Sequence, residues 1–156
     1  MAEGKDNAGV IAPPPLIFLA AVLLGIGADA LWPMGFGVER GLLIGAGAVV
    51  VAASVLLFVW SISTFRRAGT AVIPTEPSTV VVDTGPYRFS RNPIYLAFTL
   101  LTVGLALAFD APAMLVFLVV AVLIVRYGVI AREEAYLERK FGDAYRAYKA
   151  RIRRWM

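Results

Sequence analysis

The chain has 156 residues, of which 60% are hydrophobic and 17% charged, and its formal net charge at pH 7 is +4. This composition is more apolar than that of a soluble domain of similar length. Cysteine and histidine are both absent, which excludes disulfides, thiol nucleophiles, thiolate metal sites and imidazole bases. We expect one membrane-embedded domain with no metal site and no soluble basic surface for nucleic acid.

Four apolar blocks follow one another, at about residues 15–32, 41–60, 94–109 and 111–130. Each is close to the roughly 20 residues that a helix needs to cross the hydrocarbon core of a bilayer. A helix also pairs every backbone polar group internally, as that environment demands. The N-terminal sequence MAEGKDNAGVIAPPP lacks the features of a cleaved signal peptide, so the first block is expected to be retained. The pattern predicts an all-α integral membrane protein with four transmembrane helices.

The connections between these blocks differ in length and charge. Two are short turns, at 33–40 and around Asp110, whereas residues 61–92 are polar and rich in Pro, Gly and Thr. Long loops of this kind are usually functional. The long loop and the tail after Ala131 carry most of the basic residues, so the positive-inside rule places both, and the N-terminus, in the cytoplasm.

The tail is predicted to be an amphipathic helix. Its apolar and aromatic residues recur at steps of three and four, at Leu137, Phe141, Tyr145, Tyr148, Ile152 and Trp155. Such a helix either lies at the membrane interface or closes over a site, and both interpretations stay open. Gly142 interrupts the pattern and predicts a bend. In the second block, Gly41 and Gly45 have a spacing that favours close helix packing.

Polar residues gather next to apolar blocks in three places. In GPYRFSRNPIYL, Asn92 and Pro93 are typical of a helix N-cap and first turn. The same helix start, beside Arg91, also suits a carboxylate or phosphate, with Tyr87 and Tyr95 supplying stacking surfaces or hydroxyl groups.

The second and third places are Arg126, inside the fourth block, and the pair Glu133 and Glu134 beyond it. A charge inside an apolar segment is a candidate functional group, although Arg126 can also snorkel to the interface. Glu133 follows Arg126 by two helical turns, so the two are expected on one face, roughly 10 Å apart.

These motifs, taken in order, resemble a known family. The run GPYRFSRNPIYL, an apolar hairpin and REEAYLERKFGDAYRAYKARIRRW together resemble the isoprenylcysteine carboxyl methyltransferase family and the related small membrane phospholipid methyltransferases. FRRAGTAVIPTEPSTVVVDTGPYR fits the bacterial branch, and the likeness covers about residues 65–155. It implies an S-adenosylmethionine-dependent methyltransferase with its site at the cytoplasmic membrane face, here a bacterial inner membrane.

The resemblance also implies roles for particular residues. Cofactor contacts are expected at Arg91, Asn92, Pro93, Tyr95, Glu133 and Glu134, with Tyr145 and Tyr148 enclosing the cofactor and Tyr87 beside them. Arg126 is expected near the methyl acceptor, and Arg126 and Glu133 are the candidate catalytic residues. Many family members have histidine where this chain has Asn92, and asparagine is no base near neutral pH.

The sequence leaves the acceptor open between lipids, small thiols and isoprenoid acids such as an isoprenylcysteine-type carboxylate. A carboxylate acceptor needs no base, whereas an amine or thiol acceptor must be deprotonated. The chain is predicted to be one domain, with a helical hairpin at 1–64 and the cofactor-binding and catalytic part at 65–156. Two alternatives are a non-catalytic membrane scaffold or transporter subunit, and a reductase of related fold using a nicotinamide cofactor.

Overall fold

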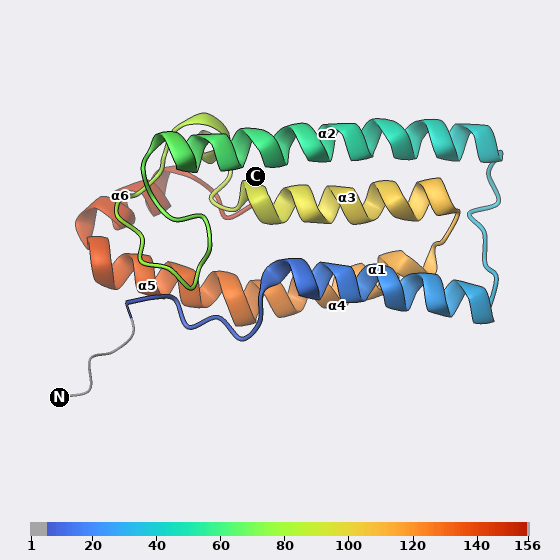
Figure 1. Ribbon diagram of the computed structural model, residues 1–156, viewed down its shortest axis with the longest axis horizontal. Helices are drawn as coiled ribbons and strands as arrows, with labels where there is room; N and C mark the ends of the chain where they lie inside the picture. The colour runs from blue at the N-terminus through green and yellow to red at the C-terminus, as the bar shows by residue number, and fades with distance from the viewer. Residues whose placement is uncertain (1–5, 156) are drawn as a thin grey trace.

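The computed structural model describes residues 6–155, and every regular secondary-structure element in this part of the chain is a helix. Four apolar helices run side by side along the long axis, with α2 packed on α3 and α1 on α4 (Figure 1). The elements are α1 (Pro14–Leu31), α2 (Arg40–Arg67), the 3-10 turn η1 (Gly85–Arg88), α3 (Pro93–Phe109), α4 (Ala113–Val125), the π-helical turn η2 (Arg126–Ile130), α5 (Ala131–Phe141) and α6 (Asp143–Arg151).

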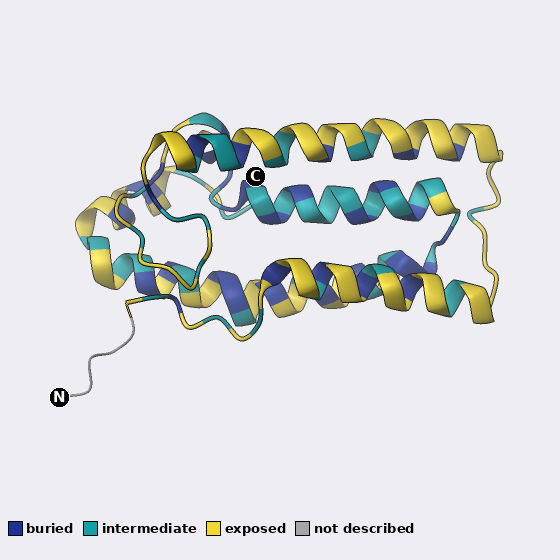
Figure 2. Cartoon of the chain, viewed as in Figure 1, coloured by how far each residue is buried: buried dark blue, intermediate teal, exposed yellow. Residues whose placement is uncertain are grey.

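The outer surface of the bundle is apolar. Large hydrophobic side chains such as Leu23, Val49 and Leu56 are more than half exposed, and exposed residues follow the outer sides of α1 and α2 (Figure 2). Three helices are long and apolar enough to cross a membrane, namely Pro14–Leu31, Arg40–Arg67 and the continuous run Ala113–Phe141. These features identify a membrane protein.

The third of the four predicted spans, α3, is apolar but has only 17 residues. At 1.5 Å per residue it is about 26 Å long, shorter than a hydrocarbon core of about 30 Å. The four predicted apolar helices are therefore present, whereas a count of four complete crossings stays a prediction.

Glycine allows α2 and α3 to pack closely, but not at the predicted positions. A Cβ on Gly47 would lie 2.7 Å from the carbonyl oxygen of Gly104, and a Cβ on Gly45 would meet no atom within 4 Å. A Cβ on Gly41 would meet only the side chain of Glu39. Ser54 adds a hydrogen bond between the two helices, from Oγ to the carbonyl oxygen of Ala97 at 2.8 Å. Gly41 and Gly45 therefore do not pack against α3 within the described residues, and close packing at these two glycines stays a prediction.

The helix α2 continues seven residues beyond the predicted end of its apolar block. Ser61 Oγ donates to the carbonyl of Leu57 at 2.7 Å, and Thr64 Oγ1 donates to that of Trp60 at 2.8 Å. Since both hydroxyl groups are satisfied by their own helix, this polar segment remains helical rather than forming loop. The long connection is correspondingly shorter than predicted.

A π-helical turn joins α4 to α5. Because this turn holds more residues than an α-helical turn, it rotates everything after it relative to α4. Arg126 is exposed, whereas the neighbouring Glu134 of α5 is buried and Glu133 is turned inward. The expectation that Arg126 and Glu133 share one helix face is wrong for this reason.

The tail forms two short helices, as its pattern predicts. Gly142 has a φ of +54° and separates α5 from α6, which confirms the predicted bend. Tyr145 and Tyr148 are buried on the inner side of α6. The N-terminal segment, the loop of residues 68–84 and both tail helices meet at one end of the bundle (Figure 1).

Candidate active site

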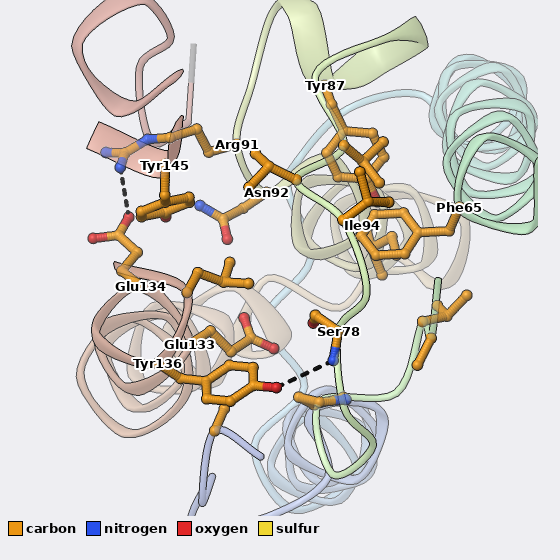
Figure 3. A pocket seen from close by; sticks show the side chains of 18 of the residues that line it. Phe65, Ser78, Tyr87, Arg91, Asn92, Ile94, Glu133, Glu134, Tyr136 and Tyr145 are labelled. Carbon is orange, nitrogen blue, oxygen red and sulfur yellow. Dashed lines mark hydrogen bonds and ion pairs between the residues drawn. The ribbon is translucent and has the colours of Figure 1, made fainter. Parts of the chain in front are cut away.

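A cavity of about 110 Å³ lies at this end of the bundle. Its walls come from the start of α3, the inner sides of α5 and α6, and the loop segment 71–82 (Figure 3). Ala8 of the N-terminal segment also borders it. The cavity is thus assembled from segments far apart in the sequence.

The cavity brings together every residue predicted to contact a cofactor. Its lining includes Tyr87, Arg91, Asn92, Pro93, Tyr95, Glu133, Glu134, Tyr145 and Tyr148. It also includes Phe65, Ser78 and Tyr136, which the sequence interpretation missed. The resemblance thus selected residues that line one cavity, although whether they bind a cofactor stays a prediction.

Glu133 presents a carboxylate to the cavity from the first turn of α5 (Figure 3). Tyr95, in the first turn of α3, donates its hydroxyl proton to Glu133 Oε1 at 2.7 Å. This bond fixes one oxygen of the carboxylate. The other oxygen can accept from a hydroxyl or ammonium group of a ligand.

Glu134 is held quite differently. Its side chain is 9% exposed, and both its oxygens accept hydrogen bonds from Arg154, with Nε 3.0 Å from Oε1 and Nη2 2.7 Å from Oε2. Arg91 Nη1 lies 3.2 Å from Oε1. The two adjacent glutamates thus have separate environments, one facing the cavity and the other paired with two arginines.

The cavity wall contains buried polar atoms without partners. Nε and Nη1 of Arg91 and the hydroxyl oxygen of Tyr87 have no hydrogen-bond partner among the described residues. The 3.2 Å approach of Arg91 to Glu134 is an ion pair whose N–H direction does not satisfy hydrogen-bond geometry. Buried polar groups are normally paired, so these atoms suit a polar ligand.

Asn92 occupies the N-cap position of α3 and Pro93 the first turn, as predicted. The side chain of Asn92, however, makes no capping bond. Its Nδ2 instead donates to the carbonyl oxygen of Arg154 at 2.9 Å. Asn92 therefore attaches the C-terminal tail to the start of α3.

The aromatic residues of the wall are neutral donors rather than bases. Burial raises the pKa of Tyr145 to about 12 and also raises the pKa values of Tyr87 and Tyr148. Tyr148 donates its hydroxyl to the carbonyl of Tyr87 at 2.9 Å, and the ring of Tyr87 packs on Phe65 with centroids 4.9 Å apart. The rings of Tyr87 and Phe65 are tilted by 58° to one another and give this side of the cavity an apolar, aromatic wall.

Tyr136 of α5 links the loop of residues 68–84 to the N-terminal segment beside the cavity. Its hydroxyl accepts from the backbone N–H of Ser78 at 3.2 Å and donates to Asp6 Oδ1 at 2.9 Å (Figure 3). Lys140 donates to the same hydroxyl and to Asp6. Tyr136 follows Glu133 by three residues, a helical spacing that could have indicated its place.

Arg126 does not line the cavity. It is exposed on η2, with its guanidinium carbon 5.6 Å from the ring centroid of Tyr127. The structure thus separates the two candidate catalytic residues, since Glu133 faces the cavity and Arg126 faces the surroundings of the bundle. A role for Arg126 in catalysis stays a prediction.

In a comparison with known proteins, the chain matches the model of one family. The family model described as phospholipid methyltransferase matches residues 42–144, from α2 to the start of α6. An uncharacterized protein of Haemophilus influenzae is 53% identical over 38 residues, which are 24% of this chain and 60% of that protein. The matched stretch thus spans less than two thirds of that relative. No solved structure matches the chain.

Proposed function

Because the chain belongs to the phospholipid methyltransferase family, we propose that it transfers a methyl group from S-adenosylmethionine to a lipophilic or small acceptor. Membership of this family implies a membrane methyltransferase, and the apolar helices agree with it. The observation that carries the finer proposal is the convergence of Tyr95, Arg91 and Glu133 on one cavity with unpaired buried donors.

The cavity fits the chemical groups of this cofactor. The aromatic rings of Tyr87 and Phe65, tilted by 58° to one another, offer apolar ring surfaces against which a purine can pack, and the Glu133 carboxylate can accept from ribose hydroxyls or the ammonium. The unpaired N–H groups of Arg91 suit a carboxylate. When bound, S-adenosylmethionine supplies a methyl group on a positively charged sulfur.

The residues of the cavity limit how an acceptor can be activated. The chain has no histidine, Asn92 is engaged with the tail, and the raised pKa values of Tyr87, Tyr145 and Tyr148 keep these phenols neutral. Where the free oxygen of Glu133 faces the acceptor rather than the cofactor, Glu133 is the base that we propose for an amine or thiol acceptor. An isoprenylcysteine-type carboxylate would need no base, and the contribution of the chain would be alignment.

Arg126 has a different proposed role from that of the cavity residues. Its exposed guanidinium lies beside Tyr127, at the end of the apolar helix α4. Basic and aromatic side chains at such a position suit the membrane interface, where Arg126 can meet an anionic acceptor or lipid. Arg126→Ala is therefore expected to bind cofactor normally and to lose turnover only if the acceptor is anionic.

The orientation of the site follows from charge. The cavity lies at the end that carries the basic loop and tail, which the positive-inside rule assigns to the cytoplasm. We propose a bacterial inner membrane with both termini cytoplasmic. The scaffold, transporter and nicotinamide-dependent reductase alternatives gain no support from the family match.

The proposal is tested by cofactor binding. The purified chain in detergent is titrated with S-adenosylhomocysteine by calorimetry, and the titration is repeated in lipid nanodiscs. We expect saturable binding by the parent and strongly reduced binding by Glu133→Gln. A folded parent that binds nothing in either medium contradicts the proposed function. Methyl transfer from labelled S-adenosylmethionine to membrane lipids or an isoprenylcysteine then identifies the acceptor.

A further inference from the structure

Arg154 lies after α6, in a segment that the sequence interpretation treated only as part of a basic tail. Its guanidinium bonds both oxygens of Glu134, and its backbone carbonyl accepts from Asn92 Nδ2 at 2.9 Å and Ser90 Oγ at 3.3 Å. The neighbouring carbonyl of Arg153 accepts from the backbone N–H of Arg91 at 3.0 Å. The end of the chain is therefore bonded along the turn that precedes α3.

Arg154 and Arg91 compete for the same carboxylate. Glu134 gives Arg154 a two-bond pairing, the favoured geometry between a guanidinium and a carboxylate. Arg91 is left with one contact of 3.2 Å that is not a hydrogen bond. The side chain of Arg91 is only 10% exposed, and its Nε and Nη1 have no hydrogen-bond partner in residues 6–155.

The charge of Arg91 is balanced by this ion pair, but buried N–H groups without hydrogen-bond partners are costly, so Nε and Nη1 suit a ligand that accepts from them. If Arg154 were absent, Glu134 would be free to turn both oxygens to Arg91 and occupy its N–H groups. The two adjacent glutamates thus have different binding partners. Glu133 faces the cavity, whereas both oxygens of Glu134 accept from Arg154, 20 positions further along the chain, and Arg91 keeps only a 3.2 Å ion pair to Oε1.

We propose that Arg154 is a positioning residue of the cofactor site, which holds Glu134 so that Arg91 remains available to a carboxylate of the bound cofactor. This inference rests on the proposed function, because the carboxylate is that of the amino-acid portion of S-adenosylmethionine or its product. Arg154 does not line the cavity, so it acts through Glu134 and Arg91.

The test compares two ligands that differ in that portion. S-Adenosylhomocysteine carries the carboxylate, whereas 5′-methylthioadenosine has the same nucleoside without it. Both are titrated by calorimetry into the parent, Arg154→Ala, the double variant Arg154→Ala/Glu134→Gln, and Arg153→Ala as the matched control. Arg153 is a neighbouring arginine with an exposed side chain, and thermal melting verifies that every variant is folded.

We expect Arg154→Ala to bind S-adenosylhomocysteine about tenfold more weakly, the size of one charge-assisted hydrogen bond, and to bind 5′-methylthioadenosine as the parent does. In the double variant, removal of the competing carboxylate is expected to restore the affinity to within about threefold of the parent. Arg153→Ala is expected to bind both ligands normally.

Other outcomes overturn the inference. Equal weakening for both ligands would give Arg154 a general structural role, and a double variant as weak as Arg154→Ala would exclude competition for Arg91. A loss of affinity in Arg153→Ala as large as that in Arg154→Ala would mean that the tail acts only through its positive charge and not through the bonds of Arg154 to Glu134. A parent that binds neither ligand contradicts the proposed function itself, and the inference fails with it.

Discussion

The two ends of the helical bundle satisfy their polar groups in opposite ways. At the end with short turns, Asp110 adopts a left-handed conformation with φ +56° and accepts from the backbone N–H of Phe36 at 2.8 Å. Glu39 accepts from the N–H groups of Gly41 and Leu42 and so caps α2. Polar side chains there accept from backbone N–H groups, Glu39 at the start of its own helix and Asp110 across to the turn between α1 and α2.

At the other end, polar side chains come from α3, α5, the tail and the loop, and several point into a cavity. Arg91 and Tyr87 contain buried polar atoms that no described residue satisfies. The comparison teaches that the polar groups of the turn end are satisfied by the chain itself, while the cavity end retains buried polar atoms that the proposed ligand would satisfy. Changes at the two ends should therefore alter different measurements.

The largest effect is expected from Glu133→Gln. The amide keeps the size of the side chain but removes the charge that Tyr95 and a ligand share. A hydrogen bond to a charged group contributes about 1.5–3 kcal/mol, so S-adenosylhomocysteine should bind roughly 10–100-fold more weakly in calorimetry. Asp110→Asn, at the opposite end, should leave this affinity unchanged. Similar losses in both variants would remove the distinction between the ends.

A change in the scaffold should affect stability and leave binding intact. In Gly47→Ala, the new methyl group would lie 2.7 Å from the carbonyl oxygen of Gly104 and 2.8 Å from the backbone nitrogen of Ala108. Neither backbone atom can move alone, so the variant should lose about 1–3 kcal/mol.

Gly45→Ala is the matched control, because its methyl group meets no atom within 4 Å. Both substitutions gain the same helix propensity, and the difference between their melting temperatures in detergent isolates the clash between α2 and α3. Equal melting temperatures would show that these helices do not pack through Gly47.

A smaller effect is expected at Tyr136, where the loop and the N-terminal segment are bonded to α5. Tyr136→Phe removes the hydroxyl that joins Ser78 of the loop to Asp6 of the N-terminal segment. The loss of about 1 kcal/mol should loosen the loop locally and accelerate amide hydrogen exchange in residues 71–82 without ligand. Tyr127→Phe, at an exposed position, should leave exchange unchanged. Protection of Ser78 equal to that of the parent would contradict the role of Tyr136.

The sequence predicts the parts of this fold that depend on local patterns. The four apolar blocks, the start of α3 at Pro93 and the bend at Gly142 follow from composition, backbone chemistry and periodicity. The C-terminal end of α2 lies beyond the predicted end, because the hydroxyl groups of Ser61 and Thr64 donate to carbonyl oxygens of the same helix. Local pattern could not reveal those bonds, because the same residues favour loops elsewhere.

The candidate site was predicted as a set of residues but not as an arrangement. The resemblance selected residues that line one cavity, including Glu133 and Glu134, yet it assigned the two glutamates a common role. Glu134 is held apart from Glu133 by Arg154, one of several arginines in a basic tail, and Arg126 is exposed on η2 rather than in the cavity. Such long-range pairings and a single π-helical turn leave no signal in a periodic pattern.

The smallest effect is expected at the turn end and depends on pH. Hydrogen bonds from Gly41 and Leu42 lower the pKa of Glu39 below its usual 4.5. The cap therefore stabilises the fold fully above pH 4.5, and this contribution disappears as pH falls through the lower pKa of the folded state. Thermal melting of the parent and Glu39→Gln should differ at pH 7 and converge below pH 4, while S-adenosylhomocysteine affinity at pH 7 stays equal. A difference in melting temperature that persists unchanged at low pH would mean that Glu39 stabilises α2 without its charge. A difference in S-adenosylhomocysteine affinity between the parent and Glu39→Gln would mean that a change at the turn end alters binding in the cavity at the opposite end of the bundle.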